Sequence, residues 1–355
     1  MSVETCKNLL YNRGPQLLGL CIAGLVGSLV TLLVTAPPAT APPRAAAAHS
    51  SPKAVSHIQA HVRAVRIRAV RRRHDPKPKT RPRATISVYE STTAPSVFKE
   101  QGCRAARRRA TGVVILDFGM PSYNGHTYGT ILFSGAFAGN KKITRAMFGY
   151  ARGYGGCLPR GSTDHISLAR GTSNYHPSVP SVYRAGRKWA RETMMLQRML
   201  RHAKLHGYVT SAAADDVEPA WDPSFWRTRD FYRGYADSRV GHALYNYGSL
   251  DGGIVRGFWS AHQAFYVTAG MRYARAIPEI YNRAMAREWA ALAQVAHRRY
   301  HRPIKFAGVM TEHTSGNRGM KPKDAHRMLV RELAVQGRGT APARVPATYT
   351  NIGSY

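Results

Sequence analysis

From residue 112 onward, short apolar runs alternate with longer amphipathic stretches, and this alternation limits the folds open to the chain. Apolar runs of a few residues predict buried strands, and longer segments with helical periodicity predict helices. Strands are expected at 112–119, 129–134, 165–170, 208–213, 243–247, 274–281, 304–310 and 348–352. Helices are expected at 143–154, 185–206, 223–235, 259–269, 283–299 and 322–335. Such alternation implies a parallel sheet with helical crossovers, and seven or eight strands predict a closed (β/α)8-type barrel.

The first 35 residues carry a candidate membrane segment. Residues 17–34 form an uncharged apolar run, which is near the lower limit for a membrane-spanning helix. A cleaved signal peptide is the alternative, but prolines at 37, 38, 42 and 43 interrupt the obvious cleavage sites. We expect an uncleaved anchor at the cell membrane, with the C-terminal domain outside. If the segment is cleaved, the protein is secreted.

Residues 36–110 are rich in Pro, Ala and Arg and predict a disordered basic linker. Residues 53–109 alone hold 16 Lys or Arg against three acidic residues. Such a composition buries too little apolar surface to offset the entropy of ordering. The net charge of the whole chain, +33, favours anionic partners. The expected domains are therefore an anchor at 1–35, this linker, and a barrel at 111–355.

The anionic partners of the linker depend on the side of the membrane on which it lies. Outside the cell, they would be anionic cell-wall polymer or lipid headgroups. Nucleic acid requires the Arg tracts to face the cytoplasm, which the expected orientation disfavours. An exported domain also favours a disulfide between Cys103 and Cys157, the two cysteines outside the N-terminal segment. Two unpaired buried thiols are the alternative.

A cluster of acidic residues follows the strand expected at 208–213. Only 19 of the 355 residues are acidic, yet Asp215, Asp216 and Glu218 lie within four positions. Side chains alternate along a strand, so Asp216 and Glu218 are expected on one side and Asp215 on the other. Barrel enzymes place their active sites at the C-terminal strand ends. Two carboxylates that face one cleft are the groups that cleave a glycosidic bond.

The run Val114-Ile-Leu-Asp117-Phe-Gly, with Asp216-Val-Glu218 99 residues later, resembles the family 25 glycoside hydrolases. These are lysozyme-type muramidases with a β/α barrel, and related glycoside-hydrolase-like barrels occur in secreted bacterial proteins. In that family an Asp ends the first strand, and an Asp-x-Glu, whose Glu is the general acid, ends the fourth. The resemblance covers residues 112–336. It implies that Glu218 is the acid and that the substrate is peptidoglycan or another polysaccharide.

Other residues near the expected strand ends complete the candidate site. Asp216 or Asp117 is expected to remain ionised and to stabilise positive charge that develops on the sugar. Further substrate-binding candidates are Asp215, Trp221, Tyr247, Glu279, Tyr281 and Glu312. Asp215 could instead cap a helix or pair with an arginine, Glu279 could form an ion pair with a nearby arginine, and Trp221 could belong to the core. No cofactor is expected.

A metal site is also conceivable, because carboxylates and imidazole are common ligands of divalent ions. The candidates are Asp215, Asp216, Glu279, Glu312 and His313. We expect no metal, since the paired histidines of the chain fall at helix C-terminal ends, opposite the expected mouth. Three functions remain: a glycoside hydrolase, a non-catalytic barrel that binds glycans or organises the envelope, and a nucleic-acid binder that uses the Arg-rich linker.

Overall fold

The computed structural model describes residues 84–354, apart from 177, 314–318 and 338–341. Its main sheet consists of eight parallel strands: β1 (Thr85–Tyr89), β2 (Gly112–Asp117), β6 (Ile166–Gly171), β7 (Val209–Asp215), β8 (Leu244–Asn246), β9 (Ala274–Ala276), β10 (Val309–Thr311) and β11 (Tyr349–Gly353). Each strand from β1 to β9 pairs with the next in this order, β10 pairs with β11, and β11 pairs with β1. Between β9 and β10 the described residues form only two isolated bridges, from Ala276 to Phe306 and from Glu279 to Met310. The sheet is a nearly closed parallel barrel, as the alternation predicts.

The barrel begins earlier than the sequence indicates. Strand β1 and helix α3 (Pro95–Arg107) both lie within the predicted linker at 36–110, so that prediction is wrong for residues 85–107. The helix buries Phe98 and Ala106 against the barrel and directs its cations to solvent. Arg104 and Arg107 lie in its last turn, where the helix dipole favours positive charge. The Arg-rich segment near residue 107 is therefore the exposed end of an amphipathic helix.

The expected strand at 129–134 does not belong to the barrel. An antiparallel sheet of β3 (Met120–Tyr123), β4 (Tyr128–Ile131) and β5 (Phe137–Gly139) is inserted after β2. Asp117 therefore ends the second barrel strand and not the first. The sequence misses β1 and wrongly counts the strand at 129–134 as a barrel strand. The numbering of the later barrel strands is therefore unchanged. Asp215 still ends the fourth strand, and Asp216 and Glu218 follow it.

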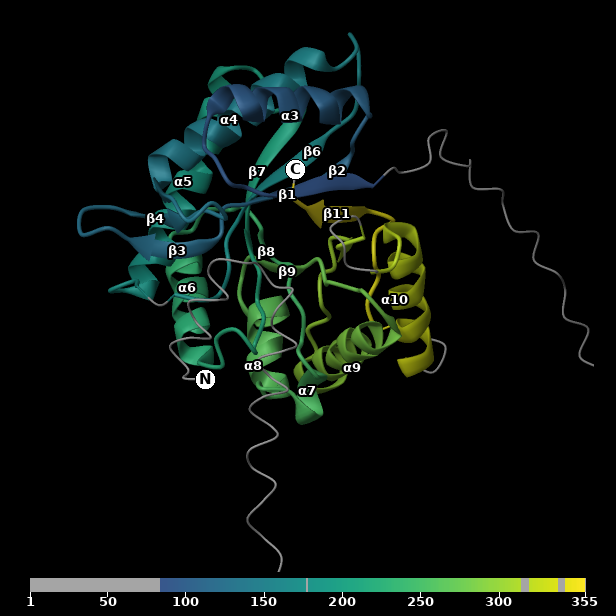
Figure 1. Cartoon of the computed structure of the whole chain (residues 1–355). Coiled ribbons are helices and arrows are strands. Elements are labelled where there is room, and N and C mark those ends of the chain that lie inside the picture. The colour runs from purple at the N-terminus through teal and green to yellow at the C-terminus, as the bar shows by residue number, and fades with distance from the viewer. Residues whose placement is uncertain (1–83, 177, 314–318, 338–341, 355) are drawn as a thin grey trace, which may run out of the picture. The chain divides into compact units, whose positions relative to one another are not determined.

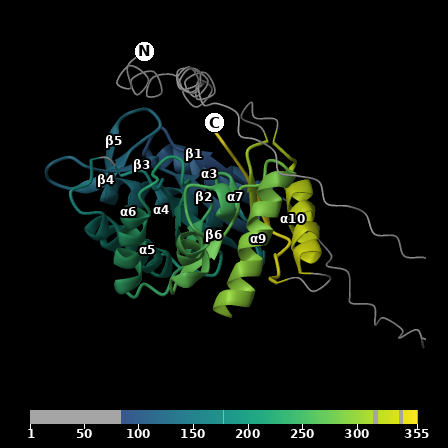
Figure 2. The ribbon, with the colours of Figure 1, turned by 90° about the horizontal axis from the view of Figure 1, so that it is seen from below.

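Helices cover the outside of the barrel (Figure 1). They are α3, α4 (Asn140–Cys157), α5 (Val182–His202), α6 (Phe225–Asp237), α7 (Gly253–Arg256), α8 (Ala261–Phe265) with the π-helical turn η2 (Tyr266–Gly270), α9 (Arg283–Tyr300) and α10 (Pro322–Gln336). Figure 1 and the rotated view in Figure 2 both show α9 and α10 side by side, away from α3, α4 and α5. Separate apolar clusters fill the helix–sheet layers, and another fills the barrel interior.

Helices α3 and α4 are held together at very short range. A Cβ on Gly102 would lie 2.0 Å from the Tyr150 carbonyl oxygen, and one on Gly153 would lie 1.9 Å from that of Lys99. Only glycine permits this approach of two backbones. The expected disulfide between Cys103 and Cys157 is present, with a Cα–Cα distance of 5.1 Å, and it joins the same two helices. The N-terminal part of the barrel is thus fastened both by packing and covalently.

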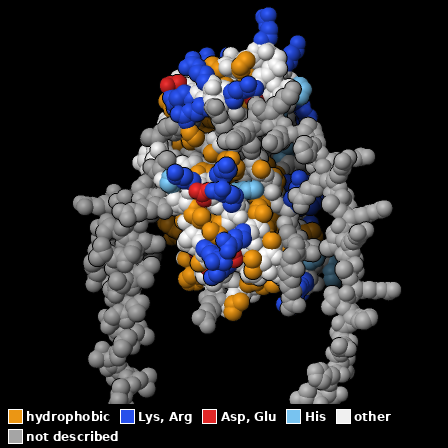
Figure 3. Space-filling view, turned by 90° about the vertical axis from the view of Figure 1, so that its right-hand side faces the viewer, with side chains coloured by type: hydrophobic (Ala, Val, Ile, Leu, Met, Phe, Trp, Pro, Cys, Tyr) orange, Lys and Arg blue, Asp and Glu red, His pale blue; other side chains and the backbone are white. Residues whose placement is uncertain are grey.

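Basic side chains also mark the surface of the folded domain. On the face shown in Figure 3, Lys and Arg side chains form several separate groups with few acidic side chains beside them. Within the described residues, no helix has the length and apolar character needed to cross a bilayer. The predicted membrane segment at 17–34 lies outside those residues, as does most of the predicted linker.

Candidate functional site at the barrel mouth

Strand alternation carries a set of polar side chains to the C-terminal mouth of the barrel. The cluster that fills the barrel interior contains Ile115, Ala214, Tyr245, Ile277 and Met310. Two positions further along each chain segment, the same inward side carries Asp117, Asp216, Tyr247, Glu279 and Glu312. Four of these five residues are acids, and each comes from a different strand end. They therefore lie close together above the apolar interior of the barrel, as the sequence predicts.

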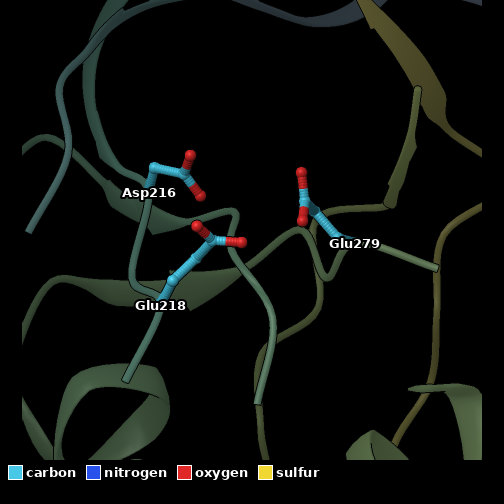
Figure 4. A group of neighbouring side chains, drawn as sticks. All are labelled: Asp216, Glu218 and Glu279. Carbon is cyan, nitrogen blue, oxygen red and sulfur yellow. The ribbon is translucent and has the colours of Figure 1, made fainter. Parts of the chain in front are cut away.

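Asp216, Glu218 and Glu279 are the closest group at this mouth. One carboxylate oxygen from each lies within 4.8 Å of those of the other two. Figure 4 shows the three side chains directed toward a common point, with Asp216 and Glu218 from the segment after β7 and Glu279 from the segment after β9. Glu279 is buried, whereas Asp216 and Glu218 are half-buried. Asp216 and Glu218 are therefore less enclosed than Glu279, although Asp216 Oδ1 is itself buried.

The backbone around Glu218 is fixed by an amide side chain. Asn174, in the segment after β6, donates from Nδ2 to the Glu218 carbonyl at 3.1 Å and accepts the Glu218 N–H at 3.3 Å. Asn174 is completely buried. The pair of hydrogen bonds holds the segment after β7 against its neighbour and sets the position of the Glu218 side chain.

Burial raises the pKa of every acid in the group. Burial is also the main reason that the pKa of Glu218 rises to about 8, and Asp251 and Glu312 add repulsion. The pKa values of Asp216 and Glu279 are raised well above the ordinary range, first by burial and then by neighbouring carboxylates, including Glu218. None of the causes for these three groups is a cation. At neutral pH the group therefore retains protons.

Asp117 and Tyr247 lie deeper in the barrel. Asp117 accepts the Gly119 N–H at 2.8 Å, and burial raises its pKa to about 7. Tyr247 is fully buried and donates toward the Thr172 carbonyl at 3.4 Å. Both predicted site residues thus support the floor of the mouth, where they are closed off from solvent.

Glu279 has a hydrogen-bond donor of its own. Tyr281 donates from its hydroxyl to Glu279 Oε1 at 2.6 Å, which opposes the effect of burial and lowers the pKa of this carboxyl. Asp216, in contrast, has a buried Oδ1 without a hydrogen-bond partner among the described residues. Of the two carboxylates beside Glu218, only Glu279 therefore has, within the described part of the chain, a hydrogen bond that stabilises its ionised form. The ion pair with arginine that the sequence allows for Glu279 is absent among the described residues.

Asp215 is separated from the other acids. It is completely buried, and both of its oxygens are without a hydrogen-bond partner within the described part of the chain. Its strand neighbour Ala213 packs in the layer beneath α5 and α6, so Asp215 faces the helices. The structure does not bring this predicted substrate-binding residue to the mouth. The helix cap and the arginine pair that the sequence allows for Asp215 are also absent among the described residues.

Trp221 and Tyr89 lie at the rim of the site. Trp221 is 48% exposed, which rules out a core position, and its side chain donates a hydrogen bond to Glu218. Tyr89 ends β1 and interacts electrostatically with Asp117, Asp216, Glu279 and Glu312. Sequence reasoning missed Tyr89 because its strand lies in the predicted linker. The alternation in Thr-Ile-Ser-Val-Tyr at 85–89 is the signal that could have revealed it.

The same three acids could hold a divalent cation. Asp216, Glu218 and Glu279 offer only oxygen ligands, the type that Mg²⁺ and Ca²⁺ prefer. His313 is not part of this group, and its Nδ1 contacts the Gly319 carbonyl at 2.7 Å. The expectation of a metal-free site stays a prediction.

Comparison with known proteins adds no relative. The sequence matches no protein-family model, and no curated protein is similar to it at a significant level. The fold and the site together therefore define the class: a parallel β/α barrel with an acidic, proton-retaining mouth. The resemblance to family 25 glycoside hydrolases depends on the two motifs alone. Of these, Asp216-x-Glu218 follows the fourth strand as the resemblance implies, whereas Asp117 ends the second strand and not the first.

Proposed function

We propose that the protein is a glycoside hydrolase that cleaves a cell-wall or related polysaccharide, with Glu218 as the general acid. The observation that carries this proposal is the convergence of Glu218 with Asp216 and Glu279 at the C-terminal end of the barrel strands. A general acid must hold its proton at the working pH, and a pKa of about 8 meets that requirement. Glu218 is also half-buried, so a glycosidic oxygen can reach it.

Glu279 takes the second carboxylate role in this mechanism. As the glycosidic bond breaks, Glu218 gives its proton to the leaving oxygen, and positive charge develops on the sugar ring. In its ionised form, which the Tyr281 hydroxyl stabilises, Glu279 attacks the ring carbon or stabilises that charge, and a water molecule then takes up the sugar. Because burial raises the pKa of Glu279, higher pH favours this ionised form. One oxygen of Glu218 lies within 4.8 Å of one oxygen of Glu279, which is compatible with the roughly 5–5.5 Å between the carboxyl groups of retaining enzymes.

Exposed aromatic rings in the parts of the chain that follow β7 and β8 support a sugar polymer as substrate. Trp221, Trp226 and Phe258 are 48%, 59% and 60% exposed and come from the segments after β7 and β8. These segments are joined where Asp251 Oδ2 accepts the Ala220 N–H at 2.7 Å. Flat apolar rings beside hydrogen-bonding groups suit the two faces of a sugar. The same rings would serve the second candidate, a barrel that binds glycans without cleaving them.

The substitution Glu218→Gln tests the proposal, with Glu100→Gln on the exposed face of α3 as the matched control. Reducing ends released from peptidoglycan or a chitin-type polysaccharide are measured, together with binding to the insoluble polymer. We expect Glu218→Gln to lose roughly 10²–10⁴-fold in rate with binding and thermal stability retained. If the wild-type protein binds the polymer but releases no reducing ends, hydrolysis is refuted and the binding function stands.

The disulfide between Cys103 and Cys157 supports an extracellular location for the barrel. Disulfides persist in oxidising compartments and are rare in the cytosol. Polysaccharide of the cell wall lies in the same compartment. A reporter that is active only outside the membrane, fused after Tyr355, should therefore be active in cells. Activity of a reporter specific for the cytoplasm at the same position would contradict this location.

A further inference from the structure

A concave site lies on the flank of the barrel, and none of the mouth acids lines it. A cavity of about 560 Å³ opens beside α5. The antiparallel sheet contributes Tyr128, and the C-terminal end of α6 contributes Asp237 and Ser238. The α5 residues that line it are Arg184, Arg187, Lys188, Arg191 and Met194. We call this cavity the α5 cavity.

The lining of the α5 cavity carries four cations and one carboxylate. Arg184, Arg187, Lys188 and Arg191 are all exposed, and none forms a salt bridge within the described part of the chain. Asp237 instead accepts a hydrogen bond from the Tyr183 hydroxyl at 2.9 Å. The cavity therefore has a positive charge that the described residues leave unbalanced.

The spacing of these cations is unfavourable for the isolated helix. Positions 184, 187, 188 and 191 lie three and four residues apart on one helical face, where like charges repel. Each Arg or Lys could be solvated singly on an ordinary convex surface. In a hollow, however, the field of four cations is concentrated and attracts anions. An anionic ligand would relieve the repulsion.

We infer that the α5 cavity binds a phosphodiester chain of the polyol-phosphate or sugar-phosphate type. From Arg184 to Arg191 the helix rises about 10 Å, with a cation at each turn of about 5.4 Å, which suits a row of successive phosphates. Three of the four cations are arginines, whose planar fork can bind phosphate through two hydrogen bonds. Tyr128 is the one aromatic lining residue. Sites for single-stranded nucleic acid present several stacking rings, so a polymer without bases fits better.

This site is independent of the proposed hydrolysis, because none of its residues belongs to the mouth. Binding of a poly(glycerol phosphate) oligomer to the full-length protein is measured by calorimetry over a range of salt concentrations. The double variant Arg187→Gln/Arg191→Gln is compared with Arg198→Gln/Arg201→Gln, which removes two exposed arginines from the same helix outside the cavity. Both variants lose two positive charges. Non-specific binding of the oligomer to other basic segments should therefore be the same in both, and a difference in affinity reports on the α5 cavity.

We expect the cavity variant to bind the oligomer about tenfold more weakly than the control variant, with a shallower dependence of affinity on salt. Equal affinities of the two variants would overturn the inference. Oligodeoxythymidine and polyaspartate of the same charge serve as competing probes. The inference also fails if either probe binds as tightly as the polyol phosphate and is equally weakened by the cavity substitutions. If oligodeoxythymidine behaves in this way, the site recognises nucleic acid. If polyaspartate does, the site responds to charge alone.

Discussion

The acidic mouth keeps its protons because of where the cations of this basic chain lie. The chain has a net charge of +33, yet repulsion and burial, and no Arg or Lys, determine the pKa of Glu218. The arginines of α5 and α9 lie on the outside of helices whose inner faces pack on the barrel. Separation of the two charge types thus lets one molecule present an acid group at its mouth and cations on its flank.

The proposed roles of Glu218 and Glu279 predict a bell-shaped dependence of kcat/KM on pH. Glu218 must be protonated, so activity should fall as the pH rises through about 8. Glu279 must be ionised, so activity should also fall toward low pH. In Tyr281→Phe the hydrogen bond that lowers the pKa of Glu279 is lost, and the acidic limb should move to higher pH. The alkaline limb should remain near its wild-type position.

Release of reducing ends across the pH range measures both limbs. Tyr183→Phe is a suitable control, because that hydroxyl bonds Asp237 on the far flank of the domain. A Tyr281→Phe profile in which both limbs coincide with wild type would show that Glu279 is not the ionised partner. Asp216, one of the two carboxylates, with Asp117, that the sequence offers for this role, would then be the remaining candidate in the group.

Much of the site can be predicted from residues, because side-chain alternation follows from local geometry. The spacing in Asp215-Asp216-Val217-Glu218 separates Asp216 from Asp215, and the structure keeps that separation. The choice between Glu279 and Asp216 could not be predicted. It depends on the Tyr281 hydroxyl and on the depth of each carboxyl, which are tertiary properties. Asp215 illustrates the same limit, since the sequence gives its side of the strand but not its complete burial beneath the helices.

At the scale of elements, the contact between α3 and α4 depends on backbone-to-backbone packing. Gly102 and Gly153 bring the helices close enough that a methyl group at either site would overlap a carbonyl oxygen. Such an interface tolerates no added atom, since helix backbones are stiff. The disulfide between Cys103 and Cys157 fixes the same pair.

Gly153→Ala should therefore destabilise the protein, by about 1–3 kcal/mol or more in the free energy of unfolding. Gly156→Ala in the same helix is the matched control, because nothing lies within 4 Å of the position of its added Cβ. Alanine is also the better helix former by about 1 kcal/mol, so the control should be neutral or stabilising. Chemical denaturation of both variants gives the difference. If Gly153→Ala and Gly156→Ala had equal free energies of unfolding, α3 and α4 would not be in close contact near the Lys99 carbonyl in solution.

Helices with clear periodicity, such as those predicted at 185–206 and 283–299, are present as α5 and α9 with shifted ends. Most of the elements that sequence reasoning misplaced lie before residue 140. In addition, the strand predicted at 304–310 is displaced to β10 at Val309–Thr311, and the strand predicted at 274–281 is shortened to β9 at Ala274–Ala276. Strand β1 has five residues between polar segments, and α3 has a charged last turn. Neither stands out from its surroundings, because its stability comes from pairing and packing with distant parts of the chain. The single helix predicted at 259–269 is divided into α8 and the π-helical turn η2.

At the scale of the whole molecule, the barrel is closed by strands from the two ends of the described chain. Strand β1 pairs with β2 on one side and with β11 on the other. Ser87 on β1 also contacts the Thr350 hydroxyl on β11 at 2.8 Å. A chain that lacks β1 would leave two unpaired strand edges and an open apolar interior. The barrel is therefore a single cooperative unit whose integrity depends on residues 85–107.

This dependence predicts opposite outcomes for two truncations that differ by 31 residues. A chain of residues 80–355 retains β1 and α3 and should fold, with one cooperative thermal transition. A chain of residues 111–355 starts where the sequence places the barrel, and it also lacks Cys103. It should be insoluble or should lack a cooperative transition, because β2 and β11 lose their common neighbour. Circular dichroism during heating measures both, and a soluble, cooperative 111–355 fragment would show that the barrel closes without β1.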